Sequence, residues 1–194
     1  MRQAVDAQVK RFVFASSMSV YGSSFTPRPL TENDPAVPDG AAKRVVELVG
    51  ESLASGQAIE FVSLRIARVI GAGIKKTSSP WRSQIFEPAG HDSIQIPFAP
   101  EAVLSLAHVE EVARMLVALA ETSEVRSSIY HTPVEMWKAR HLKERVEEVR
   151  GVRVELGGDR AHGGPPCDGS LFARDFGFKL LGLRERLSGC QRCN

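Results

Sequence analysis

Short apolar runs alternate with amphipathic segments along this chain, and that alternation limits the possible folds more than any other feature. Residues 11–15 form an apolar run that stops at two serines, as a buried parallel strand would. Residues 59–70 form a second apolar stretch that ends before Gly71. We therefore predict an α/β fold with a parallel sheet rather than an all-α or all-β fold.

Three amphipathic segments are predicted to be helices. The first begins at residue 41 and stops near Gly56, and its apolar face is expected to pack on the sheet. That face consists of Val45, Val46, Val49 and Leu53. The second spans residues 109–121, with Ser105 or His108 as its cap. The third ends at Gly151 and is followed by a half-exposed strand over residues 152–156.

Two segments rich in proline and turn-forming residues, 23–40 and 74–100, are predicted to lack regular structure. The second contains Trp81, Phe86 and Phe98, which suggests a loop with its own packing. Such a loop is a common place for substrate contacts.

Length and charge narrow the class of protein. A chain of 194 residues is long enough for one domain with a core. The formal net charge of +2 argues against a nucleic-acid partner, so a small-molecule substrate is the better expectation. The apolar run at residues 12–15 is too short for a signal peptide or a membrane span, which predicts a cytoplasmic protein without a membrane partner.

The three cysteines suggest neither a disulfide framework nor a metal site. They are Cys167, Cys190 and Cys193, an odd number with two near the end of the chain. A closed zinc site needs four ligands, and no second pair at matching spacing accompanies residues 190–193. No metal is predicted.

Residues 9–22 contain the strongest functional signal. Here the first apolar run is followed by Ser16 and Ser17 and then by a Val-Tyr-Gly turn at residues 20–22. A hydroxyl at the carboxyl end of a parallel strand faces the crevice where ligands bind. The segment resembles the strand-to-active-site passage of the NAD(P)-dependent epimerase/dehydratase family, the extended short-chain dehydrogenases/reductases.

The resemblance implies three catalytic positions. Ser17 corresponds to the serine that polarises the substrate hydroxyl or carbonyl. Residues 38–43 resemble the Pro-Tyr-x-x-x-Lys motif, in which Lys43 is the lysine and Asp39 stands where the family has its proton-exchanging tyrosine. An aspartate is ionised at neutral pH and cannot donate a proton as a phenol does, so ordinary dehydrogenase chemistry is in doubt. Tyr21 is the nearest other phenol, although its family counterpart is mostly a packing residue.

The resemblance also implies a cofactor, NAD or NADP, and a small-molecule substrate. The residues expected at the cofactor are Ala15, Ser16, Lys43, Arg68 and Val69. Those expected at the substrate are Met18, Ser19, Trp81 and Arg82. Leu104 replaces the arginine that grips the diphosphate of nucleotide sugars, which argues against a nucleotide sugar. Residues 77–88 resemble a branch of the family that oxidises small hydroxy acids, where Arg82 pairs with a carboxylate. A sugar-like or small hydroxy-acid substrate is therefore expected. A structural loop with a solvent-facing arginine is the other interpretation of Arg82.

The front of a family member has no counterpart in this sequence, because no glycine-rich turn precedes Val13. We therefore expect one α/β domain with a partial Rossmann core at about 1–72 and 101–129 and a small substrate lobe at about 73–100 and 130–194. Cofactor binding should be weak. The unpaired strand edge at residues 12–15 predicts self-association or a complementing chain. The alternative is a non-catalytic module that acts only through association.

Overall fold

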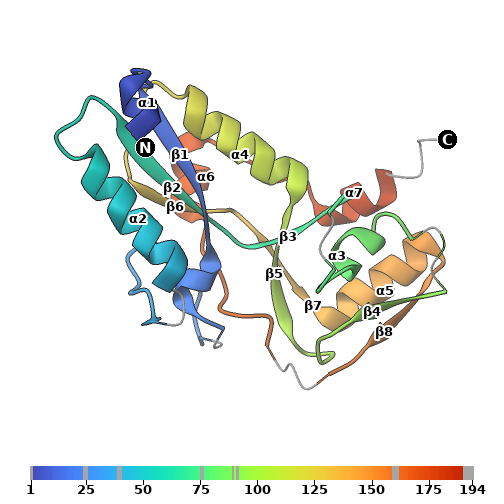
Figure 1. Cartoon of the computed structure of the whole chain (residues 1–194). Helices are drawn as coiled ribbons and strands as arrows, with labels where there is room; N and C mark the ends of the chain where they lie inside the picture. Colours follow the sequence, from blue (N-terminus) through green and yellow to red (C-terminus); the bar gives the residue numbers. More distant parts are fainter. Residues whose placement is uncertain are drawn as a thin grey trace.

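Two parallel strands from the first third of the chain form the sheet around which the other elements are arranged (Figure 1). β1 (Arg11–Ser17) pairs with β2 (Glu60–Ile66) along its whole length. β2 pairs in turn with β6 (Ile129–His131), also in parallel. The structure is a computed structural model that describes residues 2–23, 26–38, 41–74, 77–88, 90, 92–158 and 162–189. The predicted α/β fold with a parallel sheet is confirmed.

Two further sheets are small. β3 (Arg68–Ile70) lies parallel to β5 (Val103–His108), which pairs antiparallel with β7 (Glu135–Lys138). β4 (Ser93–Ile96) and β8 (Arg153–Leu156) form a parallel pair. The helices are α1 (Arg2–Asp6), the 3₁₀ helix η1 (Met18–Tyr21), α2 (Ala41–Ala54), α3 (Trp81–Gln84), α4 (Val109–Glu121), α5 (Ala139–Arg150), α6 (Ser170–Phe176) and α7 (Leu183–Gly189). Within the described ranges, none of them has the length and apolar character needed to span a bilayer.

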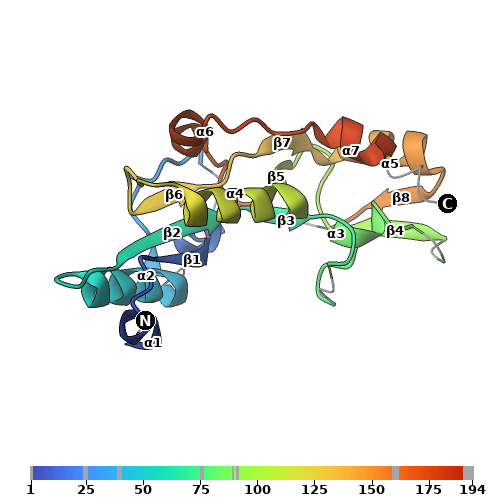
Figure 2. The same cartoon turned by 90° about the horizontal axis from the view of Figure 1, so that it is seen from above.

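The alternation of side chains along β2 explains why a helix lies on each face of the first sheet (Figure 2). Val62 and Leu64 point to one face and share a buried cluster with Met115 and Leu119 of α4. Phe61 points to the other face, toward α2. Figure 1 shows α2 and α4 on either side of the strands.

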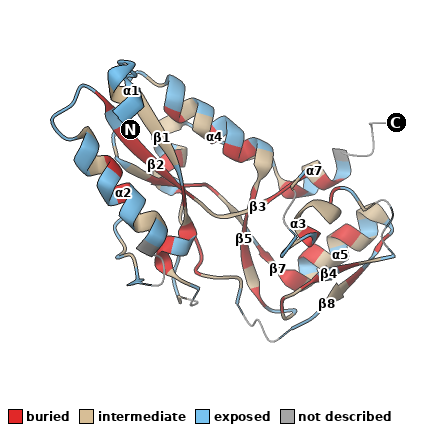
Figure 3. Cartoon of the chain, in the orientation of Figure 1, coloured by how far each residue is buried: buried red, intermediate tan, exposed pale blue. Residues whose placement is uncertain are grey.

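The orientation of α2 is opposite to the prediction. Its apolar face is exposed rather than packed on the sheet, with Val45 53% and Val49 50% exposed, and Val46 and Leu53 are similarly open (Figure 3). The residues that α2 turns inward are Glu47 and Gly50. The periodicity therefore identified the helix correctly but assigned the wrong face to the sheet.

The predicted strand over residues 59–70 is two strands in two sheets. The strand is interrupted at Ala67. The N–H of this residue donates to the side-chain oxygen of Thr132 (3.0 Å) instead of to a neighbouring strand. The segment 74–100 is also more regular than predicted, since it contains α3 and β4. β4 is completed by β8, about sixty residues later, and such a distant partner leaves no local signal in the sequence.

Other elements follow the prediction closely. α4 has the predicted bounds, and the side chain of His108 caps it by accepting a hydrogen bond from the N–H of Glu110. α5 ends at Gly151, which adopts the left-handed conformation (φ 64°) that favours glycine at this place. The segments α3, β4, α5 and β8 meet in a core separate from the one under α4. In Figure 1 the elements of this second core are separated from β1 and β2 by β5 and β7.

Candidate active site

A cleft of about 770 Å³ opens at the carboxyl ends of β1 and β2. It lies where the chain leaves the first sheet at Ala67 and enters the second, and crevices of this kind are the usual ligand sites of parallel α/β sheets. Its walls come from the strand ends, η1, α3, β5 and the later segment 162–165. The lining residues are Ser17, Met18, Ser19, Gly22, Ser23, Ile66, Ala67, Arg68, Arg82, Phe98, Ser105, His162, Gly163, Gly164 and Pro165.

Ser17 ends β1 and lines this cleft. Its side-chain oxygen accepts a hydrogen bond from the N–H of Ser19 (3.1 Å) and so caps η1. Because the oxygen acts as an acceptor in that contact, its O–H proton stays available for a second partner. The hydroxyl is thus held at the strand end in a fixed place and can still donate to an oxygen in the cleft.

Lys43 lies on α2 beside the same strand end. Its ammonium donates to the main-chain oxygen of Ala15 (2.9 Å) and lies 4.9 Å from the centre of the Phe14 ring. Neither Lys43 nor Ala15 is among the residues that line the cleft. Asp39, the third predicted catalytic position, lies outside the described residues.

Two arginines face the cleft from different elements. Arg68 begins β3, donates to the main-chain oxygen of Gly163 (2.9 Å) and lies over the ring of Phe98. Arg82 comes from α3, and its Nε is buried without a hydrogen-bond partner among the described residues. Burial lowers the pKa of Arg82, and none of the described residues lining the cleft is an aspartate or glutamate. The cleft is therefore suited to an anion.

Besides Lys43 and Ala15, three more of the predicted contact residues lie outside the cleft lining. Ser16 points to the opposite face of β1 from Ser17 and donates to Glu47 (2.6 Å), as the alternation of side chains on a strand requires. Val69 lies in β3 opposite Ala107. Trp81 is buried in the second core. The cleft does bring together Ser17, Met18, Ser19, Arg68 and Arg82, five of the predicted residues.

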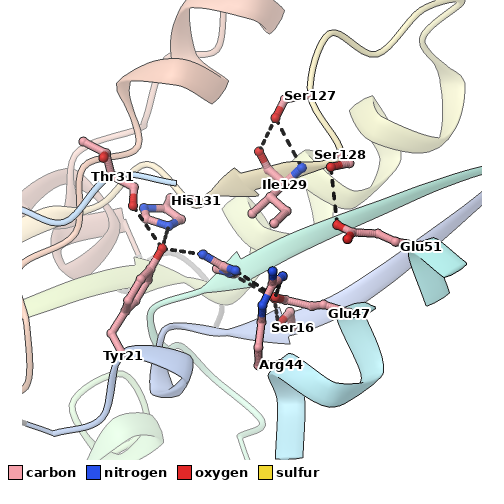
Figure 4. Close-up of polar contacts among 11 residues, drawn as sticks. Ser16, Tyr21, Thr31, Arg44, Glu47, Glu51, Ser127, Ser128, Ile129 and His131 are labelled. Atoms are coloured by element: carbon pink, nitrogen blue, oxygen red, sulfur yellow. Dashed lines mark hydrogen bonds and ion pairs between the residues drawn. The ribbon is translucent and has the colours of Figure 1, made fainter. Parts of the chain in front are cut away.

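Tyr21 does not line the cleft, and its hydroxyl is held in a buried polar network (Figure 4). Its hydroxyl contacts the ring of His131 (2.8 Å) and the main-chain oxygen of Thr31 (3.0 Å), and it accepts from Arg65. Burial raises the pKa of Tyr21 to about 12, despite the opposing charge of Arg65. A phenol in this state is a poor proton donor near neutral pH, so its position is that of a packing residue.

The longest continuous part of the lining that the sequence did not indicate is the segment 162–165. It is anchored by a bridge between Leu30 and Cys167, with the N–H of Leu30 donating to the oxygen of Pro166 (2.9 Å). A Cβ at Gly163 would overlap the backbone of Val103, so only glycine fits there. The Gly-Gly-Pro sequence was the one available signal. Burial raises the pKa of the Cys167 thiol, which contacts Met18 (3.6 Å). No cluster of metal ligands occurs in the described part of the chain.

A parallel sheet whose strand ends open onto a ligand-sized cleft, with helices on both faces, defines a Rossmann-like α/β protein. The comparison of sequences narrows the class. The model of the NAD dependent epimerase/dehydratase family matches residues 1–131, and the chain belongs to that family.

Solved structures share the fold at low sequence identity. MoeE5, determined with UDP-glucose and NAD, has a TM-score of 0.80 at 23% identity, with 98% of this chain and 68% of that chain covered. UDP-N-acetylglucosamine 4-epimerase from Methanobrevibacter ruminantium, in complex with UDP-N-acetylmuramic acid, has a TM-score of 0.78 at 22% identity, covering 95% and 63%. L-threonine 3-dehydrogenase from Trypanosoma brucei has a TM-score of 0.78 at 16% identity, covering 98% and 64%. A comparison with curated proteins found no match.

Proposed function

We propose that this chain carries the substrate-binding part of an NAD(P)-dependent oxidoreductase that acts on an anionic small molecule with a hydroxyl or carbonyl group. The observation that carries the proposal is the composition of the cleft, where Ser17 shares a wall with Arg68 and Arg82 and no described lining residue is acidic. A hydroxyl donor next to two guanidinium groups is suited to a substrate that carries both a reacting oxygen and a negative charge.

The negative charge is proposed to be the carboxylate of a small hydroxy acid, with a sugar-like acid as the other candidate. Arg82 would bind that carboxylate, because its buried Nε has no described partner. Met18 and Ser19 would contact the rest of the substrate from η1. Trp81 would act indirectly, since it packs against Phe98 under the cleft with the ring centres 6.3 Å apart. The second core would then form part of the substrate lobe, which the sequence places at about 73–100 and 130–194.

The strand ends fit the nicotinamide-bearing part of a dinucleotide. When bound, NAD or NADP supplies a hydride acceptor or donor. Lys43 gives one of its three N–H donors to Ala15, which leaves two for the ribose hydroxyl oxygens. Ser17 would hold the substrate oxygen by donating its free O–H proton. The position of Asp39 in the motif makes this residue the proposed substitute for the tyrosine, with a carboxylate in place of a phenol.

The cofactor is proposed to bind weakly to the chain alone. The sequence contains no glycine-rich turn onto a helix of the kind that holds the pyrophosphate of a dinucleotide. The chain spans 63–68% of the length of the three related structures described above. Hydride transfer by this chain is proposed to be impaired for two reasons. The glycine-rich turn that would hold the dinucleotide is missing, and Asp39 stands where the family has its proton-exchanging tyrosine.

Association with a second polypeptide is part of the proposal. β1 is at the edge of its sheet in the described structure, and only Ser16 of that strand is fully buried. Next to this edge, α2 exposes Val45, Val46, Leu48, Val49 and Leu53. An apolar helix face beside an open strand edge is costly to leave in water. A second copy or a complementing chain would cover both features. The non-catalytic alternative rests on the same two surfaces.

The test is a titration of the chain with NAD and NADP by calorimetry, followed by turnover assays at the reduced-nicotinamide absorbance band with glycerate and UDP-glucose. A dissociation constant above the low-micromolar range, with turnover of glycerate, is expected. Low-micromolar binding would contradict weak cofactor binding. Absence of turnover at saturating dinucleotide would favour the non-catalytic alternative, and turnover of UDP-glucose alone would overturn the assignment of a small hydroxy acid.

A further inference from the structure

α2 buries a carboxylate where an amphipathic helix normally buries apolar side chains. Glu47 is completely buried while the apolar residues of the same helix are open to solvent. Its carboxylate accepts hydrogen bonds from Ser16 (2.6 Å), Arg44 (3.0 Å) and two nitrogens of Arg65 (3.0 and 2.8 Å) (Figure 4). Burial alone would raise the pKa of Glu47, but the hydrogen bonds from Arg65 and Ser16 outweigh it and lower the pKa. The group is therefore an anion in the folded chain.

The buried ion pair between Glu47 and Arg65 is not expected to add much to the stability of the fold. Replacing a buried ion pair by apolar residues of similar volume is often neutral or stabilising, because the desolvation of two charges offsets their attraction. The inward position on α2 is next to Gly50, where the helix packs closely on the ring of Phe61. An apolar residue at position 47 would be the expected choice if the helix only had to cover the sheet. We therefore explain the buried carboxylate of Glu47 by the way it places α2 relative to β1, and not by a gain in stability.

The contacts of Glu47 converge on the last residues of β1. Lys43 lies one turn before Glu47 on α2, and its ammonium holds the main-chain oxygen of Ala15. Glu47 holds the side chain of Ser16, the next residue. Two consecutive residues of the strand are thus tied to two consecutive turns of the helix, and Ser17 follows directly at the cleft.

The same carboxylate also reaches the segment beyond Ser17. Arg65 binds Glu47 through two of its nitrogens and gives a third to the hydroxyl of Tyr21, the last residue of η1. η1 starts immediately after Ser17. Glu47 therefore fixes the elements on both sides of Ser17, directly through Ser16 and through Arg65 to Tyr21.

We propose that Glu47 is a positioning residue, which sets the placement of Lys43 relative to Ser17 by tying α2 to the end of β1. The proposal rests on the proposed function for the catalytic meaning of Lys43 and Ser17. Glu47 itself touches neither the cleft nor any reacting group. Its removal should therefore change the rate of turnover rather than the affinity for the substrate.

Two variants test the proposal in the full chain. Ser16→Ala removes one hydrogen bond and leaves the pair of Glu47 with Arg65 intact. The double variant Glu47→Leu, Arg65→Met replaces the whole pair by apolar side chains and so separates a loss of stability from a loss of position. Glu51→Gln is the control, because Glu51 lies one turn later on α2 and its one contact among the described residues is an exposed hydrogen bond with Ser128 (3.4 Å).

The readouts are the ¹⁵N resonance of the Lys43 ammonium, assigned by its loss in Lys43→Arg, and kcat and KM for turnover. We expect kcat to fall about 10-fold in Ser16→Ala and about 100-fold in the double variant, with KM nearly unchanged, because small misplacements of reacting groups have effects of this size. The Lys43 resonance should move toward that of exposed lysines in both variants, and Glu51→Gln should behave like the unmodified chain.

An unchanged Lys43 resonance in Ser16→Ala and in a cooperatively folded double variant would overturn the proposal, and so would a change in KM alone. If the double variant does not fold, the Lys43 resonance, kcat and KM of Ser16→Ala alone test the proposal. If the unmodified chain has no turnover, the proposed function fails, but the Lys43 resonance still decides whether Glu47 places that side chain.

Discussion

The guanidinium of Arg68 lies over the ring of Phe98, with its carbon 4.8 Å from the ring centre. This contact, together with the hydrogen bond to Gly163, holds one of the two cleft arginines in place before any ligand binds. Among the described residues, no hydrogen bond or ring contact of this kind holds the guanidinium of Arg82. The two arginines therefore have different roles in the proposed site, a fixed wall and an adaptable anion contact.

Arg82→Met should weaken binding of glycerate roughly 10- to 150-fold, which corresponds to the loss of charge-assisted hydrogen bonds worth about 1.5–3 kcal/mol. The same variant should be more stable by about 1 kcal/mol, because a half-buried cation whose side chain has no partner among the described residues is replaced by an apolar side chain. Calorimetric titration and urea unfolding measure the two effects. Arg153→Met, at an exposed position on β8, is the control. Equal binding by both variants would exclude Arg82 from the site.

Alkaline pH should destabilise the chain through Tyr21. Its pKa is raised by burial to about 12 in the folded chain, against about 10 for an unperturbed phenol. The neutral form is thus favoured by folding, so this stabilisation is complete below pH 10 and is lost as the pH rises to 12. The difference in unfolding free energy between the unmodified chain and Tyr21→Phe should shrink over that interval. A constant difference would mean that the phenol is not buried as described.

Gly50→Ala should destabilise the chain by about 1–3 kcal/mol, although the same change in an ordinary helix is stabilising. The reason is that an added Cβ at this position would overlap the ring of Phe61. Urea unfolding measures the change. Adding Phe61→Leu to Gly50→Ala should recover part of the lost stability, and a failure to do so would show that the helix does not pack on that ring.

Val49→Lys should reduce association of the chain, because it puts a charge in the exposed apolar face of α2. Val117→Lys is the matched control, since Val117 is equally exposed but stands alone on α4. Light scattering over a dilution series should show a smaller mean mass for Val49→Lys than for the control. A monomeric unmodified chain at every concentration would contradict association through this face.

Much of the fold could be predicted from local patterns. The apolar run ending at Ser16 and Ser17 marked β1, and the spacing of Val112 and Leu119 marked α4 with its correct bounds. Both signals lie within one element, where the periodicity of a helix or strand is sufficient to reveal it. Ser17 and Arg82 were predicted instead from the resemblance to the family, and both line the cleft.

The tertiary structure decided which face of each element meets a partner. The valines of α2 form a clear apolar stripe in the sequence, yet they are exposed, because Glu47 finds Ser16 and Arg65 on the sheet and Gly50 lets the helix approach Phe61. The pairing of β4 with β8 and the wall at 162–165 depend in the same way on residues far apart in the chain. Hydrophobic periodicity shows that a helix has an apolar and a polar face. Which face packs on the sheet depends on the contact free energy of each face with its neighbours, and those neighbours are brought together only in the folded chain.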